Sequence, residues 1–393
     1  MQLDFNEERI KAMQTAPSLR PFSEKAVEFL GELSGQLFKM ARPYADVIAF
    51  AYWCRRAALT SYAEEYKDSD RRLGRGLVFH IAPSNVPVNF AFSLAAGLLA
   101  GNKNVVRLPG KDSVQAELIC GAIEKTFEKY PDMTRYVYPV RYDKASGYTD
   151  ILSRYCSVRV IWGGDDTIRQ IRRSELSARA FDITFADRFS FCVIQSDDYM
   201  ALEDKRSIAS GFYNDTYFSD QNACTSPHIV FWTGNSVEAA RNIFWKELQA
   251  LVDERYELQA VQAVGKLDAF CMAAMKNKCH ICGERGKDNL IKNNLVRVEL
   301  SELDKSIREY RYHSGFFFEY QMRALTDMLA LCDEKCQTIS YVGNIGTEIE
   351  MIVAETGVNG VDRIVPVGRT MDFSLVWDGY DLIRTMSRIV VCA

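Results

Sequence analysis

Apolar residues recur every three to four positions over the first 70 residues, which is the spacing of one face of a helix. The pattern is clearest over Ser23 to Met40 and over Tyr44 to Tyr66, and it predicts two helices there. Beyond Gly76, short apolar runs alternate with helix-period segments, which is typical of βαβ units around a parallel sheet. The predicted strands are 76–81, 104–108, 135–142 and 158–162, and the predicted helices are 87–100, 114–130, 148–155 and 166–173.

A second α/β region begins near residue 197. Its predicted strands are 229–232, 315–320 and 338–342, and its predicted helices are 236–252, 258–276 and 323–332. No linker rich in proline or serine separates the two regions. We therefore predict an α/β fold with mainly parallel sheets, built from domains at 1–196 and 197–365. We expect the C-terminal tail, 366–393, to pack back on the first domain or to lie in an oligomer interface.

Composition narrows the class of protein without identifying it. The chain has 393 residues, too many for one ordinary core, and its charged fraction of 25% is typical of globular proteins. The net charge of −4 argues against a nucleic-acid partner, which would require a basic face. The N-terminus lacks the pattern of a signal peptide, and the longest apolar run, 90–100, is too short for a membrane span. We therefore expect a cytoplasmic protein.

Cys224 stands in a polar, turn-forming segment just before the apolar run Ile229 to Trp232. A loop fixed by its scaffold before a buried strand can hold a nucleophile. The signal is weak by itself, because the chain has 11 cysteines, most of which must be packing residues in reduced form. Two further features stand at the ends of predicted strands: the segment His80 to Pro87 includes the end of strand 76–81, and the pair Gly163–Gly164 follows strand 158–162. Parallel sheets bind their ligands beyond the carboxyl ends of their strands, where both features lie.

Together these segments resemble the aldehyde dehydrogenase superfamily, and in detail its acyl-CoA reductase branch of the LuxC type. Gln221 to Cys224 is similar to the catalytic Gly-Gln-x-Cys motif of the superfamily, and the resemblance extends from about residue 74 to the C-terminus. Other similar segments are 83–87, 95–97, 100–106, 163–164, 361–368 and 377–382. The resemblance implies an aldehyde-dehydrogenase-like fold with a Rossmann-like cofactor domain, a catalytic cysteine domain and assembly into a homo-oligomer.

The resemblance also implies chemistry for named residues. Cys224 as thiolate would attack an acyl thioester, and the Asn85 side-chain amide with the Cys224 backbone N–H would hold the oxyanion. Hydride from a reduced nicotinamide would then release the aldehyde. Hydrolytic members of the superfamily carry a general-base Glu, but the corresponding segment here, Thr184 to Arg188, has none. This absence favours a reductase over an enzyme that oxidises aldehydes to acids.

The sequence leaves two assignments open, which are the base that activates Cys224 and the choice between NADP(H) and NAD(H). His228 is a candidate base four residues after the cysteine, unless its ring points away from a strand that begins at Pro227. The superfamily usually has Lys-Pro-Ser after its second strand, whereas Leu108 precedes Pro109 here. Arg107 or Lys111 could meet a 2′-phosphate, which favours NADP(H), with NAD(H) as the alternative. The predicted cofactor-binding residues are Pro83, Ser84, Arg107, Lys111, Gly163 and Gly164.

Alternatives stay open for both metal and activity. Cys279 and Cys282 have the spacing of a zinc knuckle, but a second pair, Cys332 and Cys336, is loosely spaced. We therefore expect a cysteine-rich turn and no metal. The leading hypothesis is reduction of a fatty acyl-CoA or acyl-carrier thioester, with an acyl-protein synthetase as a candidate partner. The alternatives are an acyl-phosphate reductase, an acyltransferase or thioesterase without nicotinamide, and a non-catalytic subunit of a reductase complex.

Overall fold

The computed structural model describes residues 3–67, 71–83, 86–110, 112–282 and 293–392. The chain forms two compact units, one of residues 1–186 with 373–393 and one of residues 187–372. The second unit thus begins at residue 187, ten residues before the start predicted at 197. The reason is the strand at 189–195, which pairs with strands of the second unit.

The first unit has a five-stranded parallel sheet in the order β4-β3-β2-β5-β6. Its strands are β2 (Leu77–Ile81), β3 (Lys103–Arg107), β4 (Val137–Val140), β5 (Val158–Trp162) and β6 (Phe181–Phe185). The sequence pattern predicted four of them and missed β6.

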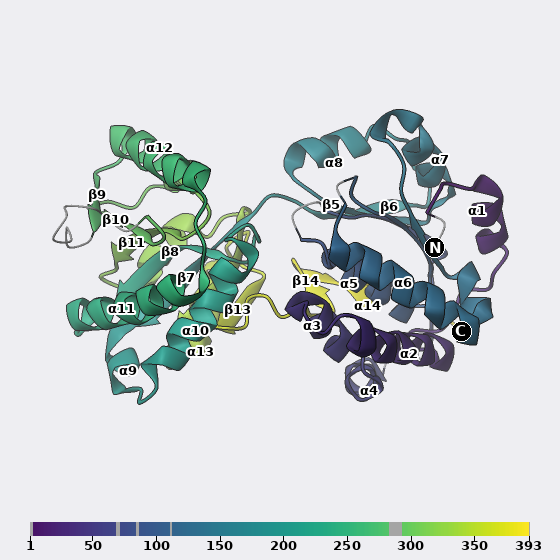
Figure 1. The fold of residues 1–393 in the computed structure, drawn as a ribbon, viewed down its shortest axis with the longest axis horizontal. Helices are drawn as coiled ribbons and strands as arrows, with labels where there is room; N and C mark the ends of the chain where they lie inside the picture. The colour runs from purple at the N-terminus through teal and green to yellow at the C-terminus, as the bar shows by residue number, and fades with distance from the viewer. Residues whose placement is uncertain (1–2, 68–70, 84–85, 111, 283–292, 393) are drawn as a thin grey trace. The chain divides into compact units, whose positions relative to one another are not determined.

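Helices cover both faces of this sheet (Figure 1). One face packs against α2 (Glu24–Met40), α3 (Ala45–Trp53), α5 (Asn89–Leu99) and α6 (Val114–Lys129). The other face packs against α1 (Glu7–Gln14), α7 (Tyr148–Tyr155) and α8 (Asp165–Ile171). The helix predicted over 44–66 is two helices, since the chain turns at Cys54 and continues as α4 (Arg56–Glu65).

Glycine lets α5 lie close to the sheet. A Cβ at Gly97 would come within 2.1 Å of Asn104 Oδ1 and 3.0 Å of His80 Nε2. His80 is fully buried there, with Nδ1 2.8 Å from Ser93 Oγ and Nε2 3.0 Å from Asn104 Oδ1. Burial lowers the pKa of His80 to about 4, so the ring is a neutral structural link between helix and sheet at neutral pH.

The second unit has a seven-stranded sheet in the order β13-β12-β7-β8-β11-β10-β9. All neighbours are parallel except the edge strand β9, which is antiparallel to β10. The strands are β7 (Phe189–Gln195), β8 (Pro227–Thr233), β9 (Cys279–Cys282), β10 (Val296–Leu300), β11 (Phe316–Gln321), β12 (Cys336–Val342) and β13 (Arg363–Pro366).

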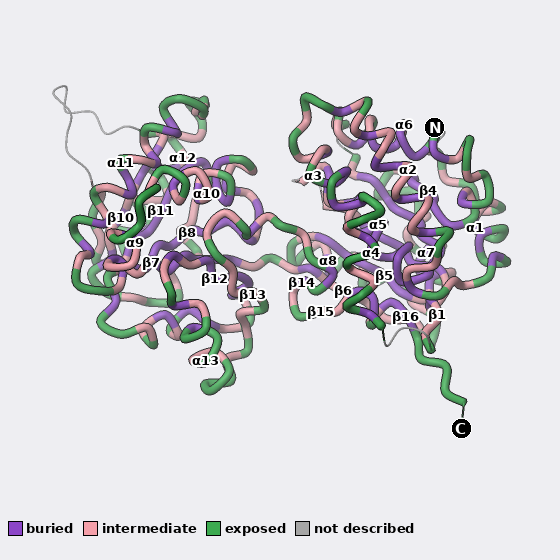
Figure 2. Tube along the Cα trace, turned by 90° about the horizontal axis from the view of Figure 1, so that it is seen from below, coloured by how far each residue is buried: buried purple, intermediate pink, exposed green. Residues whose placement is uncertain are grey.

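Two separate apolar cores lie on the two faces of this sheet. One includes side chains of α9 (Ser196–Ala201), α10 (Lys205–Thr216) and α11 (Val237–Arg255). The other includes side chains of α12 (Ala260–Lys276) and α13 (Gly346–Thr356). Figure 2 shows the central strands of both sheets as buried segments. The segment predicted as a helix at 323–332 is a shorter 3₁₀ helix, Leu325–Leu331.

The C-terminal residues from 373 onward belong to the first unit. They contain β14 (Val376–Trp377), β15 (Tyr380–Asp381), α14 (Leu382–Thr385) and β16 (Ser387–Ile389), and β16 pairs with β1 (Arg72–Gly74). Among the described helices, none combines the length and apolar character needed to cross a bilayer. The predicted fold class, two α/β units with mainly parallel sheets, is confirmed.

Candidate active site

The segment before β8 has an unusual backbone. Asp220 and Gln221 are consecutive residues with positive φ, 55° and 57°. Left-handed conformations of residues other than glycine cost about 1–3 kcal/mol each and persist only where surrounding contacts enforce them. The contacts of Asp220 and Gln221 therefore fix the position of Cys224, which comes three residues after Gln221.

Gln221 fixes the segment to two strands. Its side chain is fully buried, and Nε2 donates to the carbonyl oxygens of Pro227 (3.0 Å) and Phe316 (3.1 Å). Its Oε1 accepts from the backbone N–H groups of Gly315 (2.9 Å) and Phe316 (3.2 Å). Both donors and both acceptor positions of the amide are thus used, and the segment is joined to the beginnings of β8 and β11.

Asp220 fixes the same segment to the helices and to the loop before β11. Its Oδ1 accepts from the hydroxyls of Tyr256 and of Ser314, the latter at 2.9 Å. Its Oδ2 accepts from Gln262 Nε2 at 2.9 Å. The carboxylate therefore has partners from three separate parts of the chain, which together hold the left-handed turn.

Cys224 is partly exposed at the end of this anchored segment. Its carbonyl oxygen accepts from Ser190 Oγ on β7 at 2.7 Å, and Ser190 is itself fully buried. The next residue, Thr225, donates through Oγ1 to Met371 Sδ at 3.4 Å. The backbone that carries the thiol is thus held on both sides, while the side chain keeps some access to solvent.

His228 lies inside β8, in the second position of the strand. Its ring is 5% exposed, and burial, together with the charges of Arg311 and His313, lowers its pKa to about 3. Among the described residues, no hydrogen-bond partner faces its Nδ1. A base whose conjugate acid has so low a pKa has little tendency to take a proton from a thiol. This environment disfavours His228 as the activating base, and the assignment stays a prediction.

The sequence pattern gave no sign of a buried lysine near the cysteine segment. Lys266 on α12 is 1% exposed and donates through Nζ to the Asn293 carbonyl oxygen at 2.7 Å. Burial lowers its pKa to about 7, and the charge of Asp220 opposes this shift. Because lysines are rarely buried, the burial of Lys266 could be recognised only from the fold.

Lys266 should make stability depend on pH. Between about pH 7 and the ordinary lysine pKa, the unfolded chain keeps a proton that the folded chain releases, so stability rises with pH there. Lys266→Met should reduce this slope by up to about 1.4 kcal/mol per pH unit. Urea unfolding at several pH values would measure the slope. Lys276→Met, at an exposed position of the same helix, should leave it unchanged, and equal slopes in the two variants would contradict the prediction.

Four of the predicted cofactor residues lie at one edge of the first sheet. Pro83 follows β2, Arg107 ends β3, and Gly163 and Gly164 follow β5. Because these strands are parallel, their carboxyl ends meet at the same edge. Ser84 and Lys111 lie outside the described residues, as does Asn85, the predicted oxyanion donor.

The described residues at this edge could hold a phosphate-bearing ligand. The Arg107 guanidinium lies 4.8 Å from the centre of the Tyr142 ring, and its Nε is buried with no partner in the described part of the chain. A Cβ at Gly163 would come within 3.1 Å of Thr167 Cγ2, whereas one at Gly164 would meet nothing within 4 Å. Open backbone and a cation with an unused donor are features that a phosphate-bearing ligand can use.

The four cysteines with zinc-like spacing do not form one site. Cys279 and Cys282 lie on β9 at the edge of the sheet. Cys336 is the first residue of β12 and Cys332 shortly precedes it; both are buried, and four strands separate β12 from β9. At about 4.8 Å per strand this is far beyond the reach of a shared ion. None of the cysteines in the described part of the chain forms a disulfide bond.

Comparison with known proteins identifies the family. The model of the acyl-CoA reductase (LuxC) family matches residues 3–389. Long-chain acyl-protein thioester reductase of Vibrio harveyi is 29% identical over 172 residues, which cover 43% of this chain and 34% of the relative. The protein of the same name from Photorhabdus laumondii is 27% identical over 167 residues, covering 42% and 33%. The chain thus matches about a third of the length of these relatives.

Solved structures agree on the fold. Aldehyde dehydrogenase 21 from Physcomitrella patens has a TM-score of 0.69 at 11% identity and covers 98% of this chain and 90% of its own. Glyceraldehyde-3-phosphate dehydrogenase from Methanocaldococcus jannaschii, complexed with NADP, has a TM-score of 0.66 at 12% identity and covers 98% and 92%. The fold is that of the aldehyde dehydrogenases. Because the family model matches nearly the whole of this chain, the chain belongs to the acyl-CoA reductase (LuxC) family.

Proposed function

We propose that the protein reduces a fatty acyl thioester to the aldehyde with NADP(H), through an acyl group carried on Cys224. The observation that carries the proposal is the anchoring of a partly exposed thiol on a segment whose polar groups are buried and paired. Membership of the acyl-CoA reductase family supports it, as do the names of the Vibrio and Photorhabdus relatives.

The chain's own groups account for the first half of the reaction. The Cys224 thiolate adds to the thioester carbonyl, and the Cys224 backbone N–H, with the Asn85 amide, stabilises the oxyanion. Collapse expels the carrier thiolate, which takes up a proton, and leaves the acyl group on Cys224. A bound reduced nicotinamide supplies the hydride for the second half. Cys224 then leaves as thiolate when the aldehyde forms, so one thioester, one NADPH and one proton give one aldehyde, one free thiol and one NADP⁺.

The segment that corresponds to the general-base site of hydrolytic relatives supports reduction over hydrolysis. Asp187 is the only carboxylate among residues 184–188. It accepts from Arg311 Nη2 through both oxygens, at 2.8 and 2.9 Å. Both oxygens of the one carboxylate in this segment thus already accept from Arg311, which supports the expectation that the segment does not activate water against an acyl group on Cys224.

Turnover assays test the proposed function. The protein is mixed with acyl-CoA of several chain lengths, or with an acylated carrier protein, and NADPH oxidation, thiol release and aldehyde are measured together. Equal amounts of all three support the proposal. Thiol release without NADPH oxidation would instead support an acyltransferase or thioesterase, and reduction of an acyl phosphate alone would support that alternative. No reaction with any donor, in folded protein that binds NADPH, would reject catalysis.

Arg107 should distinguish the two nicotinamide cofactors. Arg107→Gln removes a charge-assisted contact to the 2′-phosphate, so KM for NADPH should rise about 10- to 100-fold while KM for NADH changes little. Steady-state kinetics with both cofactors measure this. Arg141→Gln removes a nearby cation that is already paired with Asp112 and should leave the preference unchanged. An equal rise in both KM values for Arg107→Gln would argue against 2′-phosphate recognition.

A further inference from the structure

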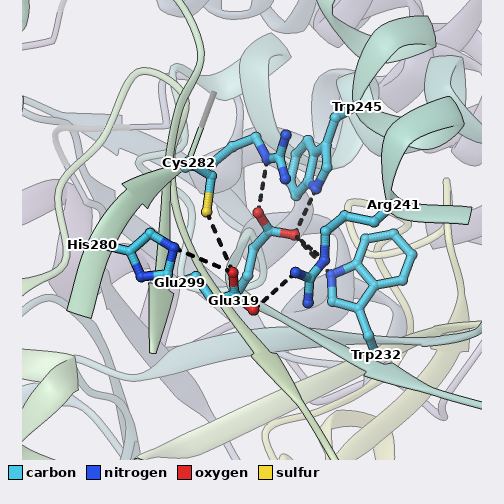
Figure 3. Close-up of polar contacts among 8 residues, drawn as sticks. Trp232, Arg241, Trp245, His280, Cys282, Glu299 and Glu319 are labelled. Carbon is cyan, nitrogen blue, oxygen red and sulfur yellow. Dashed lines mark hydrogen bonds and ion pairs between the residues drawn. The ribbon is translucent and has the colours of Figure 1, made fainter. Parts of the chain in front are cut away.

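A group of potential metal ligands lies at the edge of the second sheet, on β9 and β10. His280 and Cys282 are two residues apart on β9, so their side chains point to the same face of the sheet. In the antiparallel pairing His280 lies opposite Glu299 of β10. Figure 3 shows the imidazole, the thiol and the carboxylate directed toward one another.

The distances suit a tetrahedral ion. His280 Nε2 is 3.5 Å and Cys282 Sγ 3.9 Å from Glu299 Oε2, and one ligand atom from each of the three residues lies within 4.8 Å of the others. Zinc bonds of about 2.0–2.3 Å place tetrahedral ligand atoms about 3.3–3.6 Å apart. Movements of about an ångström, within the rotamer freedom of partly exposed side chains, would bring the three onto one ion.

Neighbouring charges hold the Glu299 carboxylate in the required orientation. Its Oε1 accepts from Arg241 Nη1 at 2.9 Å, which leaves Oε2 toward His280 and Cys282. Arg241 also lies 3.4 Å from the carboxylate of Glu319, which is fully buried. Ligating carboxylates are commonly oriented by such outer partners, and the arrangement is visible in Figure 3.

Glu319 itself is not available as a ligand. Its carboxylate accepts from Trp232 Nε1 (2.8 Å), Trp245 Nε1 (2.7 Å) and Arg297 Nε (2.7 Å). These partners satisfy both oxygens in the interior. The candidate ligands are therefore the three groups on the open side of the cluster, where the His280 side chain is 64% exposed and gives an ion access from solvent.

We propose that His280, Cys282 and Glu299 bind a zinc ion, with water in the fourth position. A thiolate and an imidazole select zinc or similar transition metals over magnesium and calcium, which prefer oxygen ligands. The ion would join the edge strand β9 to β10. The role is structural, and it is independent of the reaction assigned to Cys224. The sequence placed Cys282 in a zinc-like spacing but gave no sign of Glu299, which is 17 residues away on the neighbouring strand.

Metal titration tests the site. Zinc is titrated into the apo-protein against a chromophoric chelator, and cobalt is used to detect a thiolate-to-metal absorption band. Wild type should bind one equivalent, Cys282→Ser and His280→Ala should bind it about 10- to 100-fold more weakly, and the cobalt band should be lost in Cys282→Ser. Cys279→Ser is the matched control, because this residue lies on the same strand but packs toward the apolar core on the opposite face.

A measurement on wild type avoids dependence on folded variants. Zinc should slow alkylation of Cys282 and leave alkylation of Cys271, exposed on α12, unchanged, as mapped by mass spectrometry. Zinc should also raise the melting temperature of wild type but not of Cys282→Ser. Absence of saturable binding, equal affinity in wild type and Cys282→Ser, or failure of zinc to protect Cys282 would overturn the proposal.

Discussion

Cys224→Ala should lower the rate of aldehyde formation at least about a thousandfold, because Cys224 is the one cysteine of the anchored segment and a thiolate is a far stronger nucleophile than the neighbouring hydroxyls. Binding of NADPH should persist, since the described residues that are predicted to bind the cofactor belong to the first unit and Cys224 to the second. The measurement combines NADPH oxidation with the intact mass of the protein after incubation with acyl-CoA alone. Wild type should gain the mass of one acyl group, and the variant should not.

The control for this variant is Cys271→Ala, which removes an exposed thiol from α12. It should retain both the rate and the acyl mass. Circular dichroism of both variants shows whether folding is intact. Full activity in Cys224→Ala, or acylation of the variant to the wild-type extent, would remove Cys224 from the mechanism and with it the proposed reaction pathway.

Glu319→Gln should lower the free energy of unfolding of the second unit by about 3 kcal/mol, the cost of breaking a buried ion pair by removing one partner. The neutral amide cannot accept from two indole N–H groups and two guanidinium groups at once, so Arg297 loses its carboxylate partner. Denaturant unfolding is followed by tryptophan fluorescence, to which Trp232 and Trp245 contribute directly because both contact Glu319.

Glu254→Gln is the control for this stability prediction. Glu254 pairs with Arg206 at 3.2 Å, and both side chains are 55% exposed. Exposed pairs contribute about 0–1 kcal/mol, so the unfolding midpoint should barely change. If Glu319→Gln unfolds at the same denaturant concentration as Glu254→Gln, the carboxylate does not stabilise the strands as its contacts indicate.

The sequence predicted much of the fold because local apolar patterns determine strands and helices in a parallel α/β protein. It missed β10, although Val296, Val298 and Leu300 are buried and alternate with the less buried Arg297 and Glu299. Charged residues within a short run concealed the two-residue period there. It merged α3 with α4, since the helical spacing continues across the turn at Cys54.

The site was predictable only where its signal is local. Cys224 stands out by its place before an apolar strand, but the contacts that hold it come from far along the chain. Gln221 binds backbone groups of Gly315 and Phe316, more than 90 residues away. A buried Lys266 likewise contradicts the usual exposure of lysine. Such partners become apparent only once the strands have been placed side by side.

The anchoring of Gln221 has a consequence for how distant mutations would affect the proposed activity. A reactive group on an ordinary surface loop loses its alignment whenever the loop opens locally. Here the segment shares its hydrogen bonds with the first residues of β8 and β11, so it can open only when the ends of those strands open. Loss of packing deep in the second sheet would therefore reduce the fraction of molecules in which Cys224 is held in the anchored position. The activity would then fall without any change in the chemistry of the thiol.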